Sequence, residues 1–109
     1  MKDRIDRRRD ARRQLKRPVK LCLVNSHRCV AGRMSDVSSS GVLVNVDQAS
    51  EELVCGQRLL VGIAWTSQQV LLHSSSLVPA TVTRSADLGD TQRVAIQFDQ
   101  RLELPRLAA

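Results

Sequence analysis

Six short runs of β-branched and aliphatic residues, each closed by turn residues, follow one another along this 109-residue chain. Runs of this length at regular spacing predict antiparallel β-strands. We expect a closed six-stranded antiparallel barrel, because so short a chain cannot easily bury two sheets and still hide their edges. The expected strands are Val19–Val24, Cys29–Met34, Val42–Val46, Arg58–Trp65, Leu77–Ser85 and Gln92–Phe98, with Val70–His73 as a further short extended piece.

Positive charge is concentrated at the start of the chain. The net charge is +6, yet the first 20 residues hold ten Lys or Arg against three Asp, and the remainder is slightly acidic. This asymmetry predicts a basic arm over residues 1–17, a barrel over 18–100 and a tail over 101–109 that forms at most a short helix. Pro18 marks the first boundary because it disfavours helix at Arg17. A basic arm attracts phosphate-bearing partners.

Cysteine and glycine usage argues against several functions. Cys22, Cys29 and Cys55 form an odd count without a C-x-x-C pair or a nearby histidine pair, so we expect buried free thiols in a reducing cytoplasm and no metal site. The chain lacks a G-x-S-x-G motif, a Walker loop and a G-x-G-x-x-G motif, which argues against an enzyme and against a cofactor. No apolar run approaches the ~18 residues that a membrane span needs, and the arginine-rich start is not a secretory signal.

Two short motifs carry the candidate chemistry. The arginine motif is R-x-x-x-R at Arg13 and Arg17; the turn motif is D-x-S-x-x-G at Asp36, Ser38 and Gly41, where we expect a turn over residues 35–40. A guanidinium takes a phosphate or the O6/N7 edge of guanine in bidentate fashion. A carboxylate accepts from guanine N–H groups, and a glycine lets the backbone approach a ligand closely. Each motif is common alone, but in this order around a strand pair they favour a ligand that carries phosphates and guanine.

With both motifs in these positions, the chain resembles the PilZ domain family, the bacterial receptors for cyclic di-GMP. The resemblance covers about residues 9–100, including Ala80–Arg84 as the fifth strand and Val94–Phe98 as the strand that closes the barrel. It implies a six-stranded antiparallel barrel, which agrees with the strand count. It also implies that Arg13 and Arg17 grip phosphate and guanine. Asp36 and Ser38 would then hydrogen-bond the base and the ribose-phosphate, and Gly41 would leave room for the ligand.

Three more arginines of the arm enter through the resemblance. Arg12 precedes the arginine pair, and a basic residue there is associated in the family with two stacked cyclic di-GMP molecules rather than one. Arg8 and Arg9 are candidates for additional contacts. The spacing of the arginine motif also occurs at Arg9 and Arg13, which is the alternative pair if the frame of the motif is shifted.

The sequence therefore predicts a non-catalytic, cytoplasmic cyclic di-GMP sensor. Ligand binding would change the conformation of the arm and so regulate a separate, unidentified protein. The alternative is a small β-barrel that binds nucleic acid with its basic arm. Composition argues against this alternative, because single-strand binders stack bases on surface aromatics. The chain has no Tyr, and we expect its Trp65 and Phe98 in the barrel core.

Overall fold

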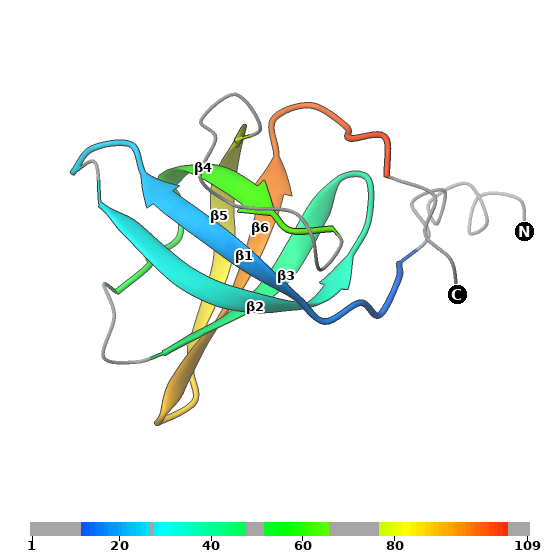
Figure 1. The fold of residues 1–109 in the computed structure, drawn as a ribbon. Coiled ribbons are helices and arrows are strands. Elements are labelled where there is room, and N and C mark those ends of the chain that lie inside the picture. Colours follow the sequence, from blue (N-terminus) through cyan, green and yellow to red (C-terminus); the bar gives the residue numbers. More distant parts are fainter. Residues whose placement is uncertain (1–11, 27, 48–51, 66–76, 105–109) are drawn as a thin grey trace, which may run out of the picture.

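Six β-strands close into an antiparallel barrel in the computed structural model, as predicted (Figure 1). The structure describes residues 12–26, 28–47, 52–65 and 77–104, so the expected piece Val70–His73 lies outside the described residues. Around the barrel the strand order is β1-β2-β3-β6-β5-β4, and β4 pairs with β1 to close the sheet. The strands are β1 (Arg17–Leu23), β2 (Cys29–Val37), β3 (Gly41–Asp47), β4 (Arg58–Ile63), β5 (Val78–Asp87) and β6 (Thr91–Phe98).

Alternation along each strand decides which side chains face the core. In β3, Val42, Val44 and Val46 are buried, while the residues between them are only partly covered. Branched side chains of this kind pack well on a pleated surface, which explains a core made largely of valine and leucine. Phe98 lies in the core as predicted, whereas Trp65 is half-buried and packs against it from outside.

Two strand pairings contain a register shift. The first lies between Met34 and Asp36 on β2, and the second between Val82 and Arg84 on β5. A bulge adds one residue to a strand and so reverses the inside–outside alternation beyond it. Met34 and Val82 are buried, but Asp36 and Arg84, two positions further on, lie outside the core. The expected turn over residues 35–40 is wrong for its first half, because β2 continues through Val37.

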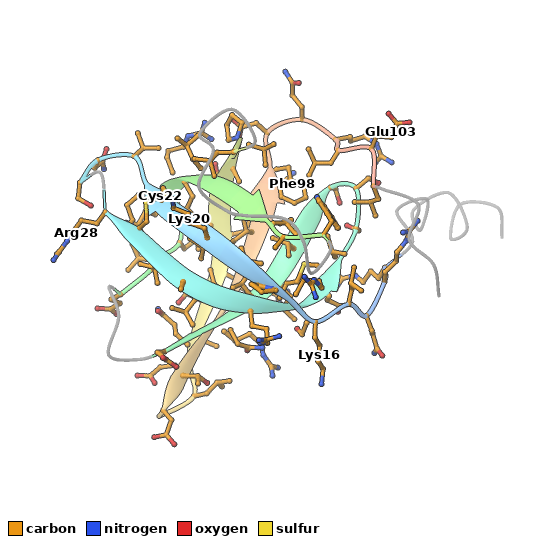
Figure 2. The ribbon with its side chains drawn as sticks, viewed as in Figure 1. Lys16, Lys20, Cys22, Arg28, Phe98 and Glu103 are labelled. Carbon is orange, nitrogen blue, oxygen red and sulfur yellow. A yellow bond between two sulfur atoms is a disulfide. The ribbon has the colours of Figure 1, made fainter. Side chains whose placement is uncertain are left out.

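Cys22 and Cys29 form a disulfide across the first hairpin. They are directly opposite in the β1–β2 ladder, and their Cα atoms are 4.0 Å apart. The expectation of free thiols is therefore wrong for these two residues, because the hairpin register pairs them. Cys55 is a free thiol but is exposed rather than buried. Figure 2 shows Cys22 at the end of the barrel near Arg28, far from Lys16 of the arm.

Backbone hydrogen bonds hold the chain that follows β6 beside the turn between β2 and β3. The Phe98 N–H donates to the Ser40 carbonyl, and the Leu102 N–H donates to the Ser39 carbonyl, both at 2.8 Å. Residues 101–104 are not helical, and the rest of the expected tail lies outside the described residues. These bonds place the first residues after the barrel directly against the turn motif.

Candidate ligand-binding site

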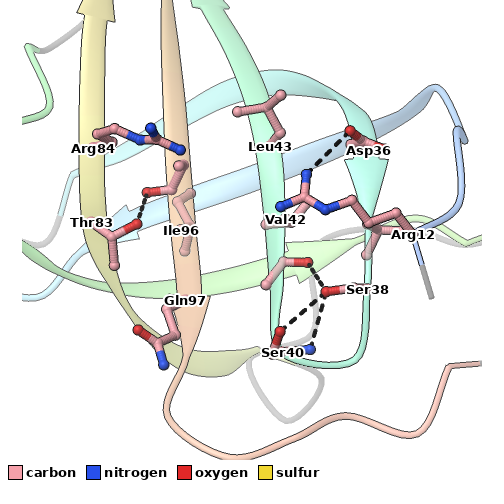
Figure 3. A pocket seen from close by; sticks show the side chains of 13 residues that line it. Arg12, Asp36, Ser38, Ser40, Val42, Leu43, Thr83, Arg84, Ile96 and Gln97 are labelled. Carbon is pink, nitrogen blue, oxygen red and sulfur yellow. Dashed lines mark hydrogen bonds and ion pairs between the residues drawn. The ribbon is translucent and has the colours of Figure 1, made fainter. Parts of the chain in front are cut away.

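A pocket of about 230 Å³ opens on the outer face of the barrel (Figure 3). Its walls come from the arm, from the end of β2 with the turn motif, and from β3, β5 and β6. The lining residues are Arg12, Asp36, Val37, Ser38, Ser40, Gly41, Val42, Leu43, Thr83, Arg84, Ala95, Ile96 and Gln97. The structure therefore brings Arg12 and the whole turn motif together in one pocket.

One wall of the pocket carries an ion pair between Arg12 and Asp36. The distance from Arg12 Nη1 to Asp36 Oδ2 is 3.5 Å, and the Arg12 side chain is 72% exposed. A long and exposed pair of this kind contributes little to stability. The position of Arg12 is fixed instead by the backbone of Arg13, which exchanges two hydrogen bonds of 2.8 and 3.0 Å with Val37. The backbone of Arg12 is thus held beside the pocket, while its guanidinium makes only the long contact with Asp36.

Ser38 shapes the turn motif from within. Its backbone N–H donates to the Gly41 carbonyl at 2.9 Å, which closes the turn. Its hydroxyl accepts from the Ser40 N–H at 3.3 Å and lies 3.2 Å from the Ser40 hydroxyl. Ser38 is buried, with 8% of its surface exposed. The side chain therefore fixes the shape of the turn that faces the pocket.

Gly41 allows β3 and β6 to approach closely beside the turn. A Cβ atom at this position would lie 2.4 Å from the Ile96 carbonyl oxygen, well inside van der Waals contact. Gly41 pairs with Gln97 at the start of the β3–β6 ladder. Strand pairing therefore requires a glycine here, quite apart from the room that the resemblance assigns to a ligand.

The arginine motif lies outside the pocket lining. Arg17 begins β1, and its Nε donates to the Ala64 carbonyl at 2.8 Å. Arg13 forms an isolated bridge with Val37, and its side chain is not part of the lining. Residues 1–11, which include the candidates Arg8 and Arg9, lie outside the described residues. Arg12 is thus the arginine of the arm that the described chain brings to the pocket.

The residues of the far wall of the pocket were not predicted from the sequence. It contains Thr83 and Arg84 from β5 and Gln97 from β6. These residues are far from the turn motif along the chain, and the pairing of β6 with both β3 and β5 brings them close to it. The alternation of polar and apolar residues along the sequence could have identified the outward face of β6. The bulge on β5 interrupts that alternation, so the sequence does not indicate the orientation of Arg84.

The PilZ domain is the family whose model matches this chain, over residues 6–108. The chain belongs to the PilZ domain family. Like other PilZ domains, it is a ligand-binding domain without catalytic activity or a cofactor. Within the four described segments, no group of three or more His, Cys, Asp or Glu residues is placed to hold a metal ion. The same segments contain no helix with the length and apolar character of a membrane span.

Solved structures share the fold of this PilZ domain. One is the inhibitor of motility MotI/DgrA from Bacillus subtilis, with a TM-score of 0.65 and 13% identity over 87% of this chain and 44% of that one. Another is the PilZ domain with cyclic di-GMP of YcgR from Escherichia coli, with a TM-score of 0.64 and 18% identity over 85% of this chain and 78% of that one. The chain spans less than half the length of MotI/DgrA. No curated protein matches it by sequence.

Proposed function

We propose that this PilZ domain is a cyclic di-GMP-binding adaptor that regulates a separate protein. The observation that carries the proposal is the shared pocket of Arg12 and the turn motif. A guanidinium, a carboxylate and closely approaching backbone are thereby within reach of one ligand. Further support comes from the PilZ domain of YcgR, which has the same fold and was solved with cyclic di-GMP.

The proposed contacts follow from the chemistry of each group. Arg12 binds a phosphate of the ligand and releases its long contact with Asp36. The Asp36 carboxylate then accepts hydrogen bonds from the N–H groups of guanine. Arg13 and Arg17 supply further phosphate or guanine contacts when their side chains turn toward the ligand. For Arg17 this means giving up the bond to the Ala64 carbonyl. In the PilZ family a basic residue before the arginine pair is associated with two stacked cyclic di-GMP molecules, and because Arg12 holds that position we propose two ligands rather than one.

The proposed output is a change in the arm. Ten basic residues among the first 20 repel one another, and the phosphates of the ligand neutralise that repulsion. The arm then closes over the ligand and changes the surface that the barrel offers to a protein partner, which is an order–disorder switch. We propose that ligand binding and the change in the arm occur in the cytoplasm, where a second messenger meets its receptors.

Isothermal titration calorimetry at physiological salt tests the proposal, with cyclic di-GMP, GTP and a short single-stranded oligonucleotide as probes. We expect saturable binding of cyclic di-GMP alone, and the stoichiometry distinguishes one ligand from two. A charge-assisted hydrogen bond contributes about 1.5–3 kcal/mol, so Arg12→Ala should weaken binding roughly tenfold to a hundredfold. Arg93→Ala is the matched control, because Arg93 is exposed, contacts Asn45 at 3.4 Å and is absent from the lining.

Two outcomes would overturn the proposal. The first is an absence of heat with cyclic di-GMP together with salt-sensitive binding of the oligonucleotide, which would favour the nucleic-acid alternative. The second is equal affinity of the wild-type protein and the Arg12→Ala and Arg17→Ala variants, which would remove the arm from the site and so overturn the proposed output, even if cyclic di-GMP still binds.

A further inference from the structure

A row of four outward-facing residues crosses the floor of the pocket from β2 to β5. Asp36 pairs with Leu43, Leu43 pairs with Ala95, and Ala95 pairs with Arg84. Neighbouring strands lie about 4.8 Å apart, so the backbone of the row spans roughly 14 Å from Asp36 to Arg84. All four residues line the pocket. The pocket therefore has a carboxylate at one end, a guanidinium at the other and an apolar floor between them.

Both charged ends of this row are placed by β-bulges. Thr83 is the extra residue on β5, and its hydroxyl donates to the Ala95 carbonyl at 3.1 Å. Without this bulge, alternation from the buried Val82 would direct Arg84 into the core. The shift between Met34 and Asp36 does the same for the carboxylate on β2. Bulges that re-aim side chains in this way are common next to functional sites, and here they face each other across one pocket.

The Arg84 side chain is directed across the pocket. Figure 3 shows its guanidinium extending over β6 toward Leu43 and Asp36. Among the residues that the structure describes, none hydrogen-bonds or ion-pairs with this guanidinium. Leu43 and Ala95 lie between the two ends of the row and contribute apolar side chains to the lining there. This combination suits a planar base that lies on the floor and turns one edge toward Arg84.

We propose that Arg84 selects guanine, by donating two hydrogen bonds to the O6/N7 edge of a base that lies over Leu43 and Ala95. The proposal rests on the proposed function and adds the residue that distinguishes the bases. Guanine presents two acceptors on this edge, which match the forked donors of a guanidinium. Adenine presents one acceptor and one donor there, so the second N–H of Arg84 finds no partner. The arginines of the arm, by contrast, meet the ligand from the side of Asp36.

The test compares the affinities of the full chain for cyclic di-GMP and cyclic di-AMP, measured by calorimetry. The variants are Arg84→Ala, which removes the guanidinium, and Arg84→Lys, which keeps the charge without the fork. Arg93→Ala is again the control, since it removes an exposed arginine from neighbouring β6 outside the lining. Thermal unfolding confirms that each variant is folded, and the exposed position of Arg84 makes this the expected result.

We expect Arg84→Ala to weaken cyclic di-GMP binding roughly tenfold to a hundredfold and to reduce the preference for cyclic di-GMP over cyclic di-AMP by a similar factor. Arg84→Lys should recover part of the affinity but little of the preference, and Arg93→Ala should change neither. An unchanged preference in Arg84→Ala, or a full recovery of it by lysine, would overturn this proposal while leaving the proposed function intact. Failure of the wild-type protein to bind cyclic di-GMP would overturn both.

Discussion

Replacement of Gly41 by alanine should weaken both the barrel and its pocket. The added Cβ would begin 2.4 Å from the Ile96 carbonyl oxygen, and real Cβ contacts stay above 3.0 Å, so β3 and β6 must separate by at least 0.6 Å. The obstructing atom belongs to backbone, which cannot rotate away as a side chain can. Overpacking of this kind costs about 1–3 kcal/mol. The neighbouring bond from the Phe98 N–H to the Ser40 carbonyl, now 2.8 Å, would also lengthen.

A cost of about 2 kcal/mol lowers the melting temperature of a domain of this size by roughly 8–16 °C. Differential scanning calorimetry measures this shift, and titration with cyclic di-GMP measures the loss of affinity. Gly89→Ala is the matched comparison, because Gly89 has a φ of 96° in the β5–β6 turn and no atom within 4 Å of an added Cβ. Strain should destabilise that variant also, but without an effect on ligand binding. A Gly41→Ala protein with wild-type melting temperature and affinity would refute the reasoning.

Two other features give measurable expectations. The disulfide closes a loop with a sequence separation of 7, for which the chain-entropy estimate is about 2.5 kcal/mol. The Cys22→Ser/Cys29→Ser variant should therefore melt roughly 10 °C or more below the wild type, with Cys55→Ser as a control that stays near it; insensitivity to a reductant would contradict the bond. The hydrogen bond from Arg58 lowers the pKa of Asp99 below its ordinary value. The stability that this pair contributes is then present above the unfolded-state pKa of about 3.9 and is lost as the pH falls through the lower folded-state pKa. The melting temperature of Asp99→Asn should thus differ from wild type more at pH 7 than at pH 2, and a difference independent of pH would argue against the pair.

The strands could be predicted from the sequence because their signal is local. Alternating valines such as Val42, Val44 and Val46 identify a half-buried strand without any knowledge of its neighbours. The number of such runs, combined with the need to hide strand edges, then favours closure. Strand ends were less certain, and Arg17 illustrates the reason. Pro18 separates it from the apolar run that follows, so Arg17 looks like the last residue of a uniformly polar arm, yet its backbone already pairs with Met34.

The site was predictable only where its residues are close in sequence. The turn motif lies within six residues, and its members line one pocket. Arg84 joins them through two strand pairings and a bulge, and an inserted residue leaves no clear trace in the pattern of polarity. The disulfide was not predicted for a related reason. Cys22 and Cys29 match no local cysteine motif, and only the register of the hairpin makes them opposite neighbours.

Closure of the barrel also restricts how a partner protein is able to bind. Each of the six described strands has a hydrogen-bonded neighbour on both sides. A peptide that recognises its target by adding a strand to an open sheet edge needs unpaired backbone N–H and C=O groups in a row. The paired stretches of this barrel offer no such row. At the far end of β5, Arg84–Asp87 pair with β6 alone among the described strands. Elsewhere on the described barrel a partner must recognise side chains of the outer face, and the proposed change in the arm would alter those contacts without unpairing a strand.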